Sequence, residues 1–371
     1  MNPSRVIGLV MLLVVAAAAR VSSRVATMRA LVFPCVLSVV LWTPGSVLHA
    51  QQSNTPTVPT ITLHARGTHT VAGPLFSATS MVCDGRGNVF FDLTGPILST
   101  GNLLRISEDG QYTRPIPLPT GLGKNGEWRY SVDPDGGVYA IFSEVEKHVM
   151  IHLSSSGDEV SRTTLQLPRY FYVNSFAVLP DGRSMFFGYV PSSETSAETK
   201  GMPFSIWLDS SGRLVRKTQP GKEFSPSLNQ PDGVIAAGGP GTFIEVISSE
   251  IRVFGAGGDL LQTFPFAKPT KDSIASNLQL VDGYIGIAFQ YPANTGSTEG
   301  ERANKSEGSP GPYYGPLEQI WLLANASSGE VAAFYKMSKD FTGSALCYLG
   351  HREFLYLTVK DGHPTLVEAS E

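Results

Sequence analysis

A short unit that ends in Asp-Gly, with an apolar run directly after it, recurs along this chain of 371 residues. The turn glycines of the copies are Gly85, Gly136, Gly182, Gly233, Gly283 and, in a weaker copy without the aspartate, Gly350. The first five glycines lie 46 to 51 residues apart, and the sixth follows 67 residues after the fifth. A nearly constant period in this range is typical of repeat architectures. The repeat therefore constrains the fold more than any single residue does.

The second copy, SVDPDGGVYAIF at residues 131–142, shows what one unit contains. Its Asp133 and Asp135 suggest half of a calcium loop, but an apolar strand at 138–142 stands where such a loop needs oxygen ligands. A third strand, a Ser-Gly turn and a fourth strand follow, up to residue 163. Asp-Gly and Ser-Gly turns favour hairpins because glycine adopts positive φ without a Cβ clash. Each unit therefore predicts four antiparallel strands.

Six such units predict an all-β chain, a six-bladed β-propeller of four-stranded antiparallel blades. The last unit lacks a fourth strand, and an unpaired strand at 59–64 precedes the first unit. We predict that this N-terminal strand completes the sixth blade, because an open ring would expose unpaired strand edges. Residues 59–371 then form a single domain with a polar, Gly/Ser-rich insertion at about 292–316. The alternative is a seventh, degenerate blade hidden in that insertion.

Residues 60–371 resemble the six-bladed propellers of secreted bacterial proteins, the NHL-like and TolB-like group, in their repeated Asp-Gly unit and its flanking apolar positions. The resemblance rests on the repeat and indicates a fold, not one family within the group. Propellers carry many functions, so it implies no substrate or reaction.

Residues 1–50 have the layout of a secretory signal peptide, in which a basic start, an apolar run at 30–42 and a cleavage site before Gln51 follow each other. Met28 is an alternative start of translation. Residues 51–58 are then a linker, and the protein is secreted or periplasmic. The alternative is an uncleaved N-terminal membrane anchor. Leu48 at the −3 position supports this alternative, because a cleavage site prefers a small residue there.

The charge of the chain excludes some partners. Residues 1–50 hold four arginines and no acidic residue, so their removal shifts the formal net charge from −4 to −8. This balance argues against a nucleic-acid partner, and a membrane partner is expected only if the N-terminal segment stays uncleaved. We expect a monomer that binds a small-molecule ligand or an unknown protein.

Two cysteines remain after the leader, Cys83 near the first turn glycine and Cys347 near the sixth. Both should lie on innermost strands of blades that are neighbours across the ring closure. An oxidising compartment allows a disulfide between them, provided that their Cα atoms lie within about 7 Å. The alternative is two buried, unpaired thiols.

The residues that enter the innermost strands are the candidate binding residues. They gather at the channel mouth opposite the Asp-Gly turns, where converging aromatic and charged side chains suit a ligand or a protein partner. The candidates are Glu127, Trp128, Arg129 and Tyr130 before the second blade, Arg169, Tyr170, Tyr172 and Asn174 before the third, and Lys222 and Glu223 before the fourth. The alternative for each is ordinary packing between blades.

No catalytic residue and no cofactor is assigned from the sequence. His148 and His152 have a helical metal-binding spacing, but they flank a predicted strand, where four residues span about 13 Å. Lactonase-type six-bladed propellers hold a divalent ion with Glu, Asn and Asp in the channel, and similarity to them would put Glu127, Asn174 and Asn277 in that role. The main expectation is thus a non-enzymatic binding protein, with a metal-dependent hydrolase that uses calcium or another divalent ion, or a membrane-tethered structural module, as alternatives.

Overall fold

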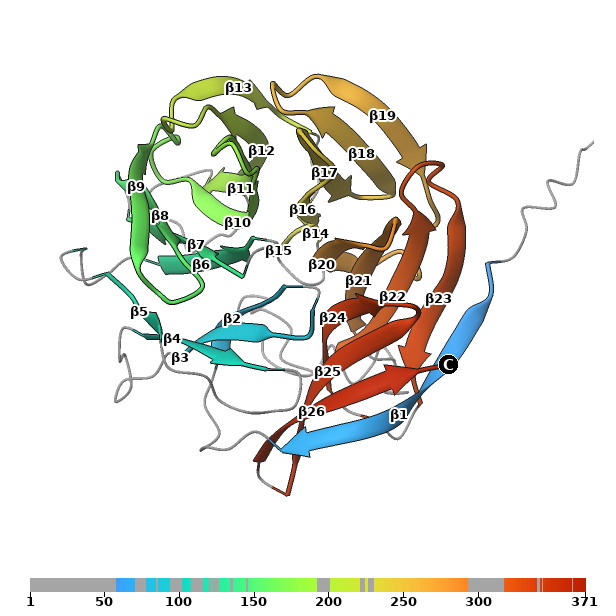
Figure 1. Ribbon diagram of the computed structural model, residues 1–371. Coiled ribbons are helices and arrows are strands. Elements are labelled where there is room, and N and C mark those ends of the chain that lie inside the picture. Colours follow the sequence, from blue (N-terminus) through green and yellow to red (C-terminus); the bar gives the residue numbers. More distant parts are fainter. Residues whose placement is uncertain are drawn as a thin grey trace, which may run out of the picture. The chain divides into compact units, whose positions relative to one another are not determined.

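The computed structural model describes residues 58–70, 78–84, 86–93, 102–107, 116–119, 122, 127–133, 136–144, 146–191, 201–220, 224–225, 230–292, 317–338, 341, 343–361 and 363–371. Every regular element in these ranges is a β-strand (Figure 1). The strands form antiparallel sheets that follow one another around a ring, so the predicted all-β, propeller-like fold is confirmed.

Four sheets have four strands each, in chain order from the innermost strand outward. The first two contain β2 (Ala78–Cys83), β3 (Val89–Leu93), β4 (Asn102–Ile106) and β5 (Ile116–Pro117), then β6 (Glu127–Val132), β7 (Val138–Ser143), β8 (His148–Leu153) and β9 (Glu159–Leu165). The next two contain β10 (Tyr172–Val178), β11 (Ser184–Pro191), β12 (Gly201–Leu208) and β13 (Leu214–Thr218), then β16 (Gly233–Ala237), β17 (Thr242–Ile247), β18 (Glu250–Gly255) and β19 (Leu260–Pro265). A small hairpin of β14 (Phe224–Ser225) and β15 (Gln230–Pro231) precedes β16.

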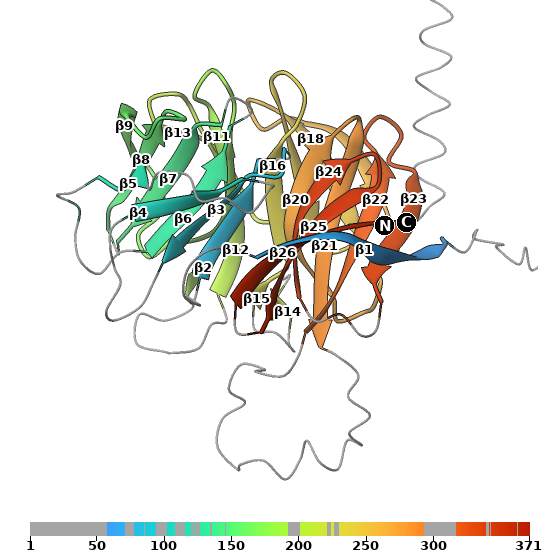
Figure 2. The same cartoon turned by 60° about the horizontal axis from the view of Figure 1, so that its bottom comes forward.

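The remaining strands form one eight-stranded sheet instead of two separate four-stranded blades. It contains β20 (Ile274–Val281), β21 (Tyr284–Pro292), β22 (Leu317–Asn325), β23 (Val331–Met337), β24 (Ser344–Gly350), β25 (Glu353–Lys360), β26 (His363–Ser370) and β1 (Thr60–Thr70). β1 joins the two halves, because its first part pairs in parallel with β23 and its second part pairs antiparallel with β26 (Figures 1 and 2). Residues 60–63 of the predicted N-terminal strand thus pair with β23, and the predicted pairing with the end of the chain is made by residues 64–70.

The core lies between consecutive sheets. Phe90 and Leu103 of the first sheet pack against Val138 and Ile151 of the second, and equivalent clusters fill the other junctions. At the closure of the ring, Val89 packs with Cys347 and Leu355. Each sheet is therefore buried on both faces, which explains why the second strand of each unit is a nearly continuous apolar run.

The fourth copy of the repeat was assigned wrongly from the sequence. Gly233 does not form the turn after an innermost strand; it begins β16, and residues 238–241 form the turn into β17. The carboxylate of Asp232 is buried, accepts a hydrogen bond from the Ala275 backbone N–H and pairs with the Lys268 ammonium group. The apolar run at 234–237 suits either position in a sheet, so the sequence pattern could not separate the two.

The proposed leader at 1–50 lies outside the described residues, as do most of the linker and most of the insertion at 292–316, where a seventh blade was the alternative. The described residues belong to one compact unit, Pro56–Glu371. No helix in the described part of the chain is long and apolar enough to cross a membrane.

Candidate functional site

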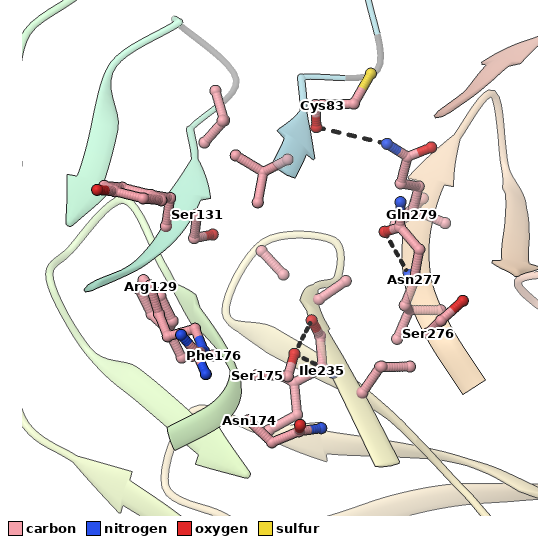
Figure 3. Close-up of a pocket in the computed structure, with 18 of the residues that line it drawn as sticks. Cys83, Arg129, Ser131, Asn174, Ser175, Phe176, Ile235, Ser276, Asn277 and Gln279 are labelled. Carbon is pink, nitrogen blue, oxygen red and sulfur yellow. Dashed lines mark hydrogen bonds between the residues drawn. The ribbon is translucent and has the colours of Figure 1, made fainter. Parts of the chain in front are cut away.

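A cavity of about 880 Å³ lies between the innermost strands and is lined by β2, β6, β10, β16 and β20 (Figure 3). Neighbouring innermost strands run in the same direction, since Asn174 and Ser175 contact Gly233 and Ile235 in the same order along both strands. The cavity therefore has an entry end, where these strands begin, and a turn end, where they end.

The polar side chains midway along the channel hold neighbouring strands together. The Asn174 amide donates to the Gly233 carbonyl at 2.9 Å, and the Ser175 hydroxyl accepts from the Ile235 N–H at 3.0 Å. The Asn277 amide donates to the Leu346 carbonyl, while its oxygen accepts from the Leu278 N–H at 2.8 Å. These bonds satisfy backbone groups that the ring geometry leaves without ladder partners. The side chains of Asn174 and Asn277, the candidate metal ligands, thus make hydrogen bonds to backbone groups.

Local backbone irregularity turns these side chains towards the next strand. The pairing of β10 with β11 shifts register between Val173 and Ser175, and that of β20 with β21 shifts between Ala275 and Asn277. Such bulges insert one extra residue and re-aim side chains near it. The bulges therefore explain how an innermost strand presents an amide to its neighbour, which strict alternation along the strand would not predict.

Cys83 of β2 and Cys347 of β24 form a disulfide with Cα atoms 5.8 Å apart. The adjacent Gln279 of β20 accepts a hydrogen bond from the Tyr348 N–H and donates to the Cys83 carbonyl at 3.5 Å. One covalent bond and one amide thus tie three innermost strands at the turn end of the channel.

Acidic residues at the turn end are engaged in their own turns. Asp133 accepts from the Gly137 N–H at 2.8 Å, and its second oxygen lies 3.0 Å from His152 Nε2. The Tyr139 ring stacks on His152 at 4.2 Å, and burial, followed by the Asp133 charge, raises the pKa of Tyr139. Asp84 likewise accepts from the Arg86 N–H at 2.8 Å and from the Asn88 amide at 2.6 Å. The carboxylates of Asp84 and Asp133 thus stabilise the turns that form this end of the channel.

His148 and His152 have different neighbours, as their positions on a strand predicted. His148 is buried beside the Ser143 hydroxyl at 3.1 Å, and burial lowers the pKa of its imidazole. His152 instead contacts Asp133. Within the described residues, no group of three or more His, Cys, Asp or Glu side chains is arranged to hold a metal ion.

The entry end carries a pair of stacked tyrosines, here called the tyrosine pair. Tyr172 begins β10 and lies opposite Tyr189 of β11, with ring centroids 5.2 Å apart and planes 14° from parallel. Both line the cavity, and Tyr172 is 42% exposed. An exposed, stacked aromatic surface in a concave site suits a ligand with a flat face.

Arg129 is the cation on the entry half of the channel. It is the third residue of β6 and is half-buried, and its side chain lines the cavity together with Ser131 (Figure 3). Its guanidinium donates to the Trp128 carbonyl at 2.9 Å. Alternation along β6 directs Trp128 and Tyr130 away from Arg129 and into the core against the first sheet, and Tyr130 also borders the cavity.

The other sequence candidates have varied positions. Arg169 and Tyr170 belong to the loop before β10 and do not line the cavity. The Arg169 guanidinium pairs with Glu146 at 2.8 Å and lies over the Tyr170 ring, 4.7 Å from its centroid. Tyr170 has a φ of 59°, a left-handed backbone conformation that costs energy in a residue other than glycine and persists only where the surrounding structure holds it. Glu127 pairs through its backbone with Ser143. The Glu127 side chain lies outside the described part of the structure, as do Lys222 and Glu223.

Tyr189 is a site residue that the sequence analysis missed. It lies near the end of the second strand of its unit, where the chain leaves towards the third strand at the entry end. An aromatic residue that closes the apolar run at 185–189 is the signal that could have identified it.

Comparison with known proteins assigns no family. No protein-family model matches the sequence, and no curated protein matches it either. Among solved structures, the chain is similar to a protein of unknown function from Bacteroides caccae, with a TM-score of 0.39 and 15% identity, over 72% of this chain and 85% of that one.

Proposed function

We propose that the chain is a six-bladed β-propeller in which the eight-stranded sheet corresponds to two blades joined by β1. Contacts between successive innermost strands support this count, since β2, β6, β10, β16, β20 and β24 each neighbour the next and β24 neighbours β2. β24, β25, β26 and β1 pair antiparallel in this order, as the four strands of one blade do. The parallel pairing of β1 with β23 then joins this blade to the preceding one.

We further propose that this propeller is a non-enzymatic binding protein that takes a small ligand at the entry end of its channel. The tyrosine pair carries the proposal, because it places an exposed aromatic surface on a cavity of ligand size. A hydrolase that binds metal through Asn174 and Asn277 is disfavoured, since both amides already bond to neighbouring strands. A protein partner that inserts a side chain into the same mouth would use the same surface.

Loss of the tyrosine pair tests the binding function. Protein comprising residues 51–371 would be screened against a small-molecule library by thermal shift, and hits confirmed by calorimetry. Tyr172→Ala should weaken binding of the hits about tenfold or more, because aromatic stacking contributes up to about 1.5 kcal/mol beyond the area buried. Tyr284→Ala is the matched control, since Tyr284 is also exposed but does not line the cavity. Equal affinities in the two variants would contradict a site at the entry end.

We propose that the protein is secreted or periplasmic and reaches its compartment by a cleaved signal peptide. The disulfide between Cys83 and Cys347 supports this, because such bonds persist in oxidising compartments. Intact-mass measurement of the full-length chain expressed with a secretion pathway should give a product that begins at Gln51. A product retaining residues 1–50 in the membrane fraction would instead favour the tethered module.

A further inference from the structure

We propose that the ligand of the entry end carries a carboxylate attached to a ring, with the carboxylate on Arg129 and the ring face on the tyrosine pair. This inference rests on the proposed binding function and specifies its ligand class. The distribution of charge along the described channel lining is the first observation that supports it.

Among the described lining residues, the acids are confined to the turn end of the channel, where Arg86 also lies, and Arg129 is the charged residue of the entry half. The acids of the lining, Asp84, Asp133 and Asp282, all follow the ends of innermost strands, whereas Arg129 stands near the start of one. Asp133 directly follows β6, four residues beyond Arg129, a separation of about 13 Å along an extended chain. A carboxylate in contact with Arg129 lies several times nearer to the guanidinium than to Asp133, so the attraction is the stronger of the two.

The acids also have contacts of their own at the turn end. Asp133 faces His152, Asp282 lies 3.5 Å from His351, and Asp84 accepts bonds from the Arg86 backbone and from Asn88. Arg129 is half-buried in a concave site, where a charge interacts more strongly than on an open surface. A guanidinium has five N–H donors, so it can keep protein partners and still hold a carboxylate through two parallel bonds.

The neutral lining of the entry half suits the rest of such a ligand. Tyr172 and Tyr189 provide the flat surface, and Ser276 exposes a hydroxyl that donates to the Ala288 carbonyl at 3.2 Å and can accept from a ligand. Sugar acids and aromatic acids share the required chemistry, a carboxylate on a ring with one flat apolar face. The two sources are distinguished by experiment.

Calorimetric titration of the 51–371 protein tests the proposal with two pairs of probes. D-glucuronate is compared with D-glucose, and 4-hydroxybenzoate with 4-hydroxybenzyl alcohol, at low and high salt. We expect one acid of the two to bind at least tenfold tighter than its neutral counterpart, and this preference should shrink as salt rises.

Arg129→Gln should abolish the preference for the acid, whereas Arg86→Gln, which removes the channel arginine at the turn end, should keep it. Arg129→Lys keeps the charge without the planar fork and should retain part of the preference. It also keeps the test informative if the glutamine variant does not fold. Circular dichroism and thermal melting report folding for each variant.

Equal binding of acid and neutral probes, or an unchanged preference in Arg129→Gln, would overturn the carboxylate inference and leave the binding function standing. Failure of both acids to bind at about 10 mM, a concentration that would nearly saturate a site with a dissociation constant of about 1 mM, would also overturn it. The binding function itself fails only if library hits are insensitive to Tyr172→Ala.

Discussion

Glu245 is a carboxyl group buried between two sheets. It lies on β17, is 1% exposed, and accepts a hydrogen bond from the Ser205 hydroxyl of β12 in the preceding sheet. Arg252 lies 3.7 Å from its second oxygen but makes closer bonds to Glu250, at 2.7 and 2.8 Å. Burial raises the pKa of Glu245 above its usual value, against the opposing effects of Ser205 and Arg252. Burial therefore makes the charged form of Glu245 less favourable in the folded protein than in the unfolded chain.

The raised pKa of Glu245 predicts a loss of stability as pH rises. The contribution of a group whose pKa is higher in the folded state is fully present below the unfolded value and declines through the folded value. Glu245→Gln keeps an acceptor for Ser205 and leaves Arg252 paired with Glu250. Urea denaturation should show this variant to be more stable than the parent at pH 8, by about 1.4 kcal/mol for each unit of the shift, and no more stable at pH 4. A difference that does not change between these pH values would contradict the prediction.

Individual residues also show how far sequence reasoning reaches. The predicted entry-end position of Arg129 and Tyr172 followed from their place at the start of repeat units, and the structure places both in the cavity lining. Trp128 and Tyr130 are on the same strand as Arg129 but pack in the core, because alternation along β6 separates their side chains from that of Arg129. The hydrogen bonds of Asn174 and Asn277 depend on bulges and on the neighbouring strand, neither of which a single strand's sequence reveals.

At the scale of elements, the hairpin between β18 and β19 at the outer edge of its sheet packs on the sheet before it. Gly258 lies in the turn between β18 and β19 with a φ of 87°, and a Cβ added there would meet Arg216 Cδ at 2.8 Å and Trp207 Cδ2 at 3.0 Å. Both neighbours belong to the β10–β13 sheet. Glycine is needed here for two reasons, the backbone conformation and the close approach.

Gly258→Ala should destabilise the protein by about 2 to 4 kcal/mol, since it adds a steric conflict to the cost of positive φ. Gly241→Ala separates the two effects, because Gly241 has a φ of 72° with open space around it. That control should cost only about 1 kcal/mol. Chemical denaturation of the two variants gives the comparison. Equal losses would show that the contact with Trp207 and Arg216 contributes nothing.

The repeat predicted most strands because hairpin turns and apolar second strands are local features of the chain. The fourth copy was assigned wrongly because its aspartate has a tertiary role. Asp232 precedes β16, where its carboxylate pairs with Lys268 and accepts a hydrogen bond from the Ala275 N–H of the next sheet. The eight-stranded sheet was also not foreseen as such. Its parallel pairing of Thr60 with Phe334 joins segments that no local pattern connects.

For the whole molecule, the first sheet meets the last strands of the chain through two ties. β1 pairs with β26 and β23 and leads along the chain to β2, and the disulfide joins β2 to β24 across a sequence separation of 264 residues. Closing so long a loop restricts the unfolded chain, which the loop-entropy account values at about 5 kcal/mol as an upper figure. Both ties oppose the same event, opening of the ring beside β2 and β24.

Because the ties act on one event, their losses should not add independently. Cys83→Ser with Cys347→Ser should cost about 2 to 4 kcal/mol in urea denaturation and leave a closed monomer, since β1 still covers β26. Protein starting at residue 71 lacks β1 and exposes the edges of β23 and β26, so it should self-associate in size-exclusion chromatography with the disulfide intact. Combining both changes should lower the protection of backbone amides in β24 to β26 against hydrogen exchange by more than the two separate effects together. If the combined loss equals their sum, the two ties stabilise separate parts of the ring, and closure does not depend on their cooperation.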